Sequence, residues 1–231
     1  MTLWAIVPAA GIGRRMQTEI PKQYLNVNGR PIIEISLARI GALSNVRQIV
    51  VMLHPQDRVW PTLGLEQNQK IVCQPGGDNR YESVLNGLRH LESVATDSDW
   101  VLVHDAARPC VRLKDINNLL NEIADHPVGG LLGAPVDNTM KLVDESDDVM
   151  STVDRVNVWS AYTPQVFRFR LLLDALIAVD KSEKTVTDEA TAIESLGYKP
   201  RMVLGHRDNI KITQSQDLSL AEQILSAQAM E

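Results

Sequence analysis

The chain has 231 residues, of which 44% are hydrophobic and 23% charged, the composition of a globular protein with a sizeable core. Its formal net charge of -6 argues against broad nucleic-acid binding, which needs a basic surface. Two cysteines cannot form a disulfide framework, and no apolar run approaches the roughly 20 residues of a membrane span. We therefore expect one domain over residues 1–231, cytoplasmic, with neither nucleic acid nor membrane as partner.

Short apolar runs alternate with segments of helical periodicity through the first 136 residues. The predicted strands cover 3–8, 46–53, 70–74, 100–105 and 129–136, and the predicted helices cover 31–43, 79–93 and 113–125. This alternation predicts an α/β fold with a Rossmann-like, mostly parallel sheet flanked by helices. Ligands of such sheets bind beyond the carboxyl ends of the strands, so the loops after the first, third and fourth strands are the candidate site.

The pattern changes near residue 137. Two short strands at 139–143 and 149–154 flank the acidic turn "DESDD", which is too charged to be buried. We therefore predict a protruding β-hairpin arm over 137–155, inserted into the single domain. The rest of the chain is predicted to supply a returning strand, two helices, two late strands and a closing helix, at 163–167, 168–180, 187–196, 200–206, 209–212 and 215–228.

The first of the three loops reads "AAGIGRRM". It lacks the third glycine of the dinucleotide fingerprint and the Gly-Lys-Ser/Thr ending of the P-loop. Its small residues would let backbone N–H groups approach a phosphate or a base, and Arg14 and Arg15 add charged donors. Pro21 then stiffens the backbone just before Lys22. The alternative is a tight turn with two solvated arginines.

The second loop, "QPGGDNRYESV", precedes a predicted helix. Gly76 and Gly77 open the turn, Asp78 can cap the helix, and Arg80 and Ser83 share one helical face. Backbone amides at a helix start can hold an anion or the polar edge of a base. A simple capped helix explains the same residues equally well.

The third loop, "VHDAARP", follows an apolar strand. Asp105 lies where an α/β enzyme places a carboxylate that faces a metal or a phosphate, and Arg108 follows closely. A structural salt bridge is the alternative. His104 reads as a structural histidine. Near the C-terminus, "RDNIKIT" adds Asp208 and Lys211 as a further carboxylate and cation.

Arg15, Lys22, Asp105 and Lys211 together are the residue types of a phosphoryl-transfer site. Such catalysis depends on cations around the transferring group and on Mg²⁺ held by a carboxylate and the nucleotide phosphates. The protein need not supply a nucleophile, and the G-x-S-x-G motif of serine hydrolases is missing from the sequence.

Eight motifs in order, "VPAAGIGRRM…PKQY", "GGDNRYESV", "VHDAARP", "DNTMK", "TVDR", "TPQ", "TDEA" and "RDNIK", resemble the 2-C-methyl-D-erythritol 4-phosphate cytidylyltransferase family. The resemblance runs from about residue 5 to residue 213. It implies transfer of CMP from CTP to methylerythritol phosphate, with release of pyrophosphate, in non-mevalonate isoprenoid biosynthesis.

The resemblance also implies a role for each matching residue. Arg15 and Lys22 would be catalytic and would bind the triphosphate, and Asp105 and Asp208 would hold Mg²⁺. Cytidine would be recognised by Ala9, Ala10, Gly11, Gly77, Asp78 and Ser83, with Asp105 beside the phosphates. The methylerythritol phosphate side would comprise Arg108, Thr163, Asp208 and Lys211, together with Thr139 and Arg155 from the arm of the second subunit of a homodimer.

Two alternatives stay open. Ribitol-5-phosphate cytidylyltransferases share the fold and the nucleotide-side motifs, although the arm and "RDNIK" favour methylerythritol phosphate. A nucleotide-binding regulator without catalysis would not need Arg15, Lys22 and Asp105 together, because a sensor requires affinity but no stabilisation of transition-state charge.

Overall fold

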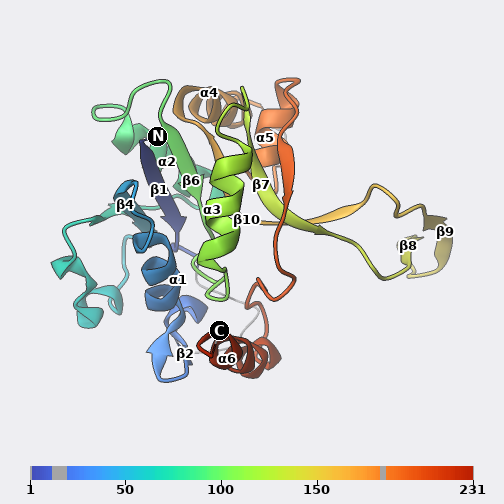
Figure 1. The fold of residues 1–231 in the computed structure, drawn as a ribbon, viewed down its shortest axis with the longest axis horizontal. Coiled ribbons are helices and arrows are strands. Elements are labelled where there is room, and N and C mark those ends of the chain that lie inside the picture. Colours follow the sequence, from blue (N-terminus) through green and yellow to red (C-terminus); the bar gives the residue numbers. More distant parts are fainter. Residues whose placement is uncertain (1, 12–19, 183–185, 231) are drawn as a thin grey trace.

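A seven-stranded sheet forms the centre of the protein (Figure 1), whose computed structural model describes residues 2–11, 20–182 and 186–230. Its strand order is β11-β7-β10-β6-β1-β4-β5. The strands are β1 (Leu3–Pro8), β4 (Val46–Leu53), β5 (Ile71–Pro75), β6 (Trp100–Val103), β7 (Gly129–Pro135), β10 (Trp159–Arg168) and β11 (Arg201–Leu204). Every neighbouring pair is parallel except the two made by β10, so the predicted mostly parallel sheet is confirmed.

Helices cover both faces of this sheet, because alternate side chains of the central strands point to opposite faces. In β1, Ala5 and Val7 pack in one apolar cluster with α1 (Ile32–Gly41) and α3 (Leu113–Glu122). Trp4 and Ile6 pack in the other with helices α2 (Arg80–Leu91), α4 (Phe169–Asp180) and α5 (Glu189–Ser195). No helix within the described ranges is long and apolar enough to cross a membrane.

The β10 strand runs antiparallel between β6 and β7 and is reached through a hairpin. Residues 136–158 join β7 to β10, and within them β8 (Met140–Val143) pairs with β9 (Val149–Val153) as a separate two-stranded sheet. Every residue of β8 and β9 is exposed. In Figure 1 this hairpin lies at the far right, away from the central sheet and its helices.

Short elements complete the molecule below the sheet in Figure 1. They are β2 (Asn26–Val27), β3 (Arg30–Pro31), the 3-10 turns Lys22–Tyr24, Trp60–Leu63 and Leu65–Gln67, and the last helix α6 (Gln216–Gln228). Ala221 of α6 is fully buried in a third apolar cluster with Val27 and Ile32. This cluster fixes the C-terminal helix beside the start of α1.

The prediction of a late strand over 209–212 is wrong. These residues pair with no strand, although Asn209 and Ile212 are buried. Their polar groups bond individually instead: Ile212 N–H donates to the Ala107 carbonyl at 2.9 Å, and the Asn209 side chain donates to the Thr163 carbonyl at 2.9 Å. The alternating apolar pattern therefore reflects an irregular segment that crosses the strand ends.

The first residue of β7, Gly129, packs too closely against β10 to carry a side chain. Gly129 has φ +122°, and a Cβ there would meet the Val166 carbonyl oxygen of β10. We expect Gly129→Ala to lower the free energy of unfolding by about 3 kcal/mol, because strain and a backbone clash combine. Gly197, at φ +85° with open space around it, is the control, and its change to Ala should cost about 1 kcal/mol. Equal losses in chemical denaturation would contradict this account.

Candidate active site

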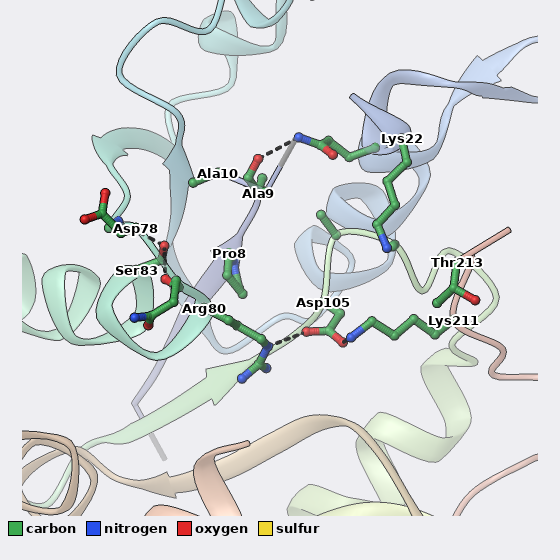
Figure 2. Close-up of a pocket in the computed structure, with 16 residues that line it drawn as sticks. Pro8, Ala9, Ala10, Lys22, Asp78, Arg80, Ser83, Asp105, Lys211 and Thr213 are labelled. Atoms are coloured by element: carbon green, nitrogen blue, oxygen red, sulfur yellow. Dashed lines mark hydrogen bonds and ion pairs between the residues drawn. The ribbon is translucent and has the colours of Figure 1, made fainter. Parts of the chain in front are cut away.

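Three loops at the carboxyl ends of β1, β5 and β6 meet around one pocket (Figure 2). The pocket has a volume of about 360 Å³, within the usual range for small-molecule sites. Its lining comprises Pro8, Ala9, Ala10, Gly11, Gly77, Asp78, Asn79, Arg80, Ser83, Asp105, Ala106 and Ala107 from these loops, with Lys22, Gln23, Lys211 and Thr213 from elsewhere. The structure thus brings together the three loops that the sequence marked.

The first two loops pack closely enough to exclude a side chain between them. A Cβ on Gly76 would lie 2.5 Å from the Ala10 Cβ, so only glycine allows this approach. Ser83 then orders the turn, since its hydroxyl accepts the Gly77 N–H at 3.0 Å and donates to the Asn79 carbonyl at 3.0 Å. The pocket wall is therefore a fixed backbone surface.

The residue that caps α2 is Asn79 rather than the predicted Asp78. The Asn79 side chain accepts the Glu82 N–H at 3.1 Å. Glu82 reaches back and accepts the Asp78 N–H at 2.8 Å and a side-chain N–H of Asn79 at 2.7 Å, so the two side chains hold the helix start reciprocally. The carboxylate of Asp78 thus makes no helix cap, and the residue lines the pocket.

Lys22 is held near the first loop by its neighbour in sequence. The buried amide of Gln23 donates to the Ala9 carbonyl at 2.6 Å, which ties the turn Lys22–Tyr24 to the end of β1. The Lys22 ammonium donates to the Ile212 carbonyl at 3.0 Å. In Figure 2 it points toward Asp105 and Lys211.

Asp105 lies at the bottom of the pocket with three cations around its carboxylate. Oδ1 accepts from Arg80 Nε at 2.8 Å, Oδ2 accepts from Lys211 Nζ at 2.7 Å, and Arg108 Nε lies 3.8 Å from Oδ2. Burial alone would raise the pKa of this carboxyl, but the positive charges outweigh burial and hold the pKa well below its ordinary value. Asp105 is therefore ionised and firmly oriented.

The neighbouring His104 is a structural histidine, as the sequence indicated. Its Nε2 lies 3.0 Å from the Arg108 carbonyl, which can only accept, so Nε2 carries the proton. Nδ1 then accepts from the Thr163 hydroxyl at 3.1 Å, and Thr163 in turn accepts the Asp105 N–H at 3.1 Å. The neutral ring thus anchors the backbone of Asp105 to β10.

A second pocket of about 260 Å³ adjoins the first. The two share Arg80, Asp105 and Lys211, which form the wall between them. The second pocket is otherwise lined by Arg108, Ala161, Tyr162, Thr163, Gln165, Thr187 and Asp188. Within the described residues, the buried Nε of Arg108 has no hydrogen-bond partner. Its nearest carboxylate oxygen is Asp105 Oδ2 at 3.8 Å, and the cations Arg80, Arg108 and Lys211 in the lining suit an anionic group in this pocket.

Other predicted site residues lie apart from these pockets. Asp208 accepts from Arg112 Nη2 at 2.7 Å and lines neither pocket, so the structure does not bring it to Asp105. Thr139 and Arg155 flank the exposed hairpin and also line neither pocket. Arg15 lies outside the described residues.

Sequence reasoning assigned no role to Arg80, Glu189 or Thr187. Arg80 lines both pockets and bonds Asp105 and Glu189, while Thr187 lines the second pocket. A signal existed for all three, because Arg80 lies in "GGDNRYESV" and the other two in "TDEA". The two partners of Arg80, however, are 25 and 109 residues away from it along the chain, so local sequence patterns do not reveal these contacts.

A glycine-containing loop, a helix start and a group of cations, all at the ends of parallel strands, define an α/β protein that handles phosphorylated ligands. Comparison with known proteins narrows this class. Residues 3–227 match the family described as "IspD: 2-C-methyl-D-erythritol 4-phosphate cytidylyltransferase", and the chain belongs to this family.

Individual relatives agree over nearly the whole chain. A Hahella chejuensis 2-C-methyl-D-erythritol 4-phosphate cytidylyltransferase is 51% identical over 220 residues, which are 95% of this chain and 91% of that protein. A Pseudomonas putida protein of the same name is 47% identical, covering 95% of this chain and 94% of its own. The crystal structure of the Francisella tularensis enzyme, 35% identical, covers 97% of this chain and 100% of that one with a TM-score of 0.82.

The buried His104 makes folding stability depend on pH. Burial lowers its pKa from 6.5 to about 4, so the unfolded chain binds more protons between these values. Stability should therefore fall as the pH drops from 6.5 toward 4, and this ring contributes roughly 2 to 3 kcal/mol of the loss between pH 7.5 and 4.5.

The variant His104→Gln keeps a donor for the Arg108 carbonyl but does not titrate. Urea unfolding at pH 7.5 and 4.5 should show that this variant loses less stability than the wild type, by roughly 2 to 3 kcal/mol. The other titrating groups are common to both proteins. The same pH dependence in both would show that His104 is not held neutral.

Proposed function

We propose that this chain transfers CMP from CTP to 2-C-methyl-D-erythritol 4-phosphate and releases pyrophosphate. Family membership supports this reaction. The observation that carries it is the pair of adjoining pockets with the common wall of Arg80, Asp105 and Lys211. A nucleotide in the first pocket and an acceptor phosphate in the second would meet at that wall.

The first pocket suits a pyrimidine nucleoside. Where the loops after β1 and β5 form its wall, backbone and small side chains can bond the polar edge of a base, and we assign this part to cytosine instead of a larger purine. The proposed cytidine-recognising residues are Ala9, Ala10, Gly11, Gly77, Asp78 and Ser83, all of which line it. Ser83 acts through the Gly77 turn, because its hydroxyl already bonds there.

The reaction requires little from the protein beyond positioning and charge. An oxygen of the acceptor phosphate attacks the α-phosphorus of CTP in line, and pyrophosphate leaves with its bonding electrons. Negative charge develops around the α-phosphorus in the transition state, and we assign the stabilisation of this charge to Lys22 and Arg15. Fixed cations at such a position lower the barrier because they need no reorganisation as the reaction proceeds.

A Mg²⁺ ion would fit this site with Asp105 as its protein ligand. Asp105 offers carboxylate oxygens, the ligands Mg²⁺ prefers, and each oxygen accepts one hydrogen bond from the described part of the chain, Oδ1 from Arg80 and Oδ2 from Lys211. No group of three candidate metal-binding side chains occurs among the described residues, and Asp208 is engaged by Arg112. The ion would therefore take most of its ligands from the triphosphate and water and one from Asp105. Bound there, it would neutralise phosphate charge.

The second pocket is assigned to the acceptor. Arg108, Thr163 and Lys211 line it, and the positive charges of Arg108, Lys211 and Arg80 support an anionic occupant. Thr139 and Arg155 line neither pocket of their own chain, and they flank an exposed hairpin whose side chains include Leu142 and Val149. We therefore propose a homodimer in which this hairpin supplies Thr139 and Arg155 to the site of the second subunit.

The first test is a pyrophosphate-release assay with both nucleotides and both acceptors. We expect turnover with CTP and methylerythritol phosphate, a kcat/KM for ATP lower by at least about 100-fold, and loss of activity in EDTA. Ribitol 5-phosphate is the acceptor control. A higher kcat/KM with ribitol 5-phosphate would show that the chain is a ribitol-5-phosphate cytidylyltransferase. Nucleotide binding without turnover would favour a regulator.

The second test addresses the shared site. Lys22→Ala should lower kcat by about two to three orders of magnitude, and Arg155→Ala should also abolish most activity. When the two variants exchange subunits, half of the dimers are mixed and each mixed dimer has one intact site of two. Activity should therefore recover to about a quarter of wild type.

Differently tagged subunits confirm the exchange, and each variant mixed with itself is the control. If Lys22 and Arg155 served one site from one chain, every site would keep a lesion. No recovery with proven exchange would refute the shared site.

A further inference from the structure

A row of alternating charges crosses the wall between the two pockets. Glu189 accepts two hydrogen bonds from Arg80, from Nη1 at 2.7 Å and from Nη2 at 3.0 Å. Arg80 Nε donates to Asp105, whose second oxygen bonds Lys211. Figure 2 shows the last three members in line, with Arg80 and Lys211 on opposite sides of the Asp105 carboxylate.

The first member of this row cannot touch a substrate. Glu189 is 1% exposed and lines neither pocket, whereas Arg80 lines both. Glu189 is also fixed in place, because Gln165 of β10 accepts the Ala190 N–H at 2.8 Å and donates to Asp188 at 2.8 Å. The carboxylate is therefore a rigid support behind the wall.

The bonds of Arg80 leave its guanidinium little choice of orientation. Its forked end faces Glu189 and its Nε edge faces Asp105, so one planar group meets two carboxylates at once. Burial would lower the pKa of this guanidinium, but the charge of Glu189 and then that of Asp105 outweigh burial and raise it above the ordinary value. Arg80 is permanently charged, and of its two counter-charges Asp105 lines the first pocket whereas Glu189 lines neither pocket.

We infer that Glu189 is a positioning residue for the reaction: it holds Arg80 so that Asp105 presents its free lone pairs and its Lys211 contact in one orientation. This inference rests on the proposed function, because the reaction is its readout. Without the bidentate support, Arg80 can turn toward the nucleotide phosphates, and Asp105 loses the donor that fixes Oδ1. The substrates still bind, but the reacting groups are misaligned.

The discriminating variant is Glu189→Gln, which keeps the shape of the side chain and one acceptor for Arg80 but removes the charge. We expect kcat to fall about 10- to 100-fold, while KM for both substrates changes less than about threefold. The melting temperature should stay within about 5 °C of wild type, because Arg80 keeps Asp105 as its counter-charge.

Asp115→Asn is the matched control. Asp115 is likewise a buried carboxylate in the first turn of a helix, it bonds the backbone N–H and the ring of His206, and it lines neither pocket. Its kcat should be that of wild type. A wild-type kcat in Glu189→Gln would overturn the inference, and an equal loss in Asp115→Asn would do the same.

A second pair of variants separates positioning from stability. Arg80→Gln leaves Glu189 charged and buried, so its melting temperature should fall clearly. The double variant Arg80→Gln, Glu189→Gln removes both charges and should regain most of that loss while kcat stays low. If kcat recovered together with the melting temperature, the pair would be only structural and the inference would fail. Absence of turnover in the wild type would instead refute the proposed function.

Discussion

One buried negative charge organises the site. The Asp105 carboxylate could not lie at the bottom of a pocket without nearby positive charge, because an unpaired ion in the interior is strongly unfavourable. Its partners come from three separate parts of the chain: the start of α2, the loop after β6 and the irregular segment after β11. The same bonds that compensate Asp105 thus hold these parts together at the ends of the strands.

This arrangement explains how a chain of net charge -6 can bind anions. Four positive charges, on Lys22, Arg80, Arg108 and Lys211, line the two pockets, and the last three of these pair with the carboxylates of Asp105 or Glu189. A phosphate that enters meets oriented donors at known positions instead of mobile surface lysines. Orientation of this kind matters more to a transfer reaction than total charge, since donors that are already in place do not have to rearrange.

Much of the architecture could be predicted from the sequence, because it depends on local patterns. Runs such as 3–7 and 49–52 are buried on both sides in the structure, and continuous apolar stretches are typical of central strands. The three candidate loops followed from the rule that parallel strands place ligands beyond their carboxyl ends. These parts required no knowledge of which residues meet across the fold.

The remaining features depend on long-range contacts that no local pattern encodes. Arg80 bonds one residue that is 25 positions away along the chain and another that is 109 positions away. Asp208 bonds Arg112 and does not line the pocket. The segment 209–212 alternates like a strand, yet Ile212 N–H bonds the Ala107 carbonyl of a loop, and the Asn209 side chain bonds the Thr163 carbonyl of β10. The N-cap of α2 is Asn79, one residue after the predicted Asp78. Asp and Asn are both favourable N-cap residues, and only the geometry of the turn selects between them.

The hairpin between β7 and β10 has a consequence for how members of this fold can diverge. Pro135 pairs with Trp159, so residues 136–158 close a connection between two strands that are already neighbours in the sheet. Such a connection can lengthen, shorten or change its surface without any rearrangement of strand order, because no sheet hydrogen bond lies within it except those of β8 with β9. Apart from Thr139 and Arg155, for which a role in the site is proposed, the surface of the hairpin can therefore vary while the pocket wall stays constant.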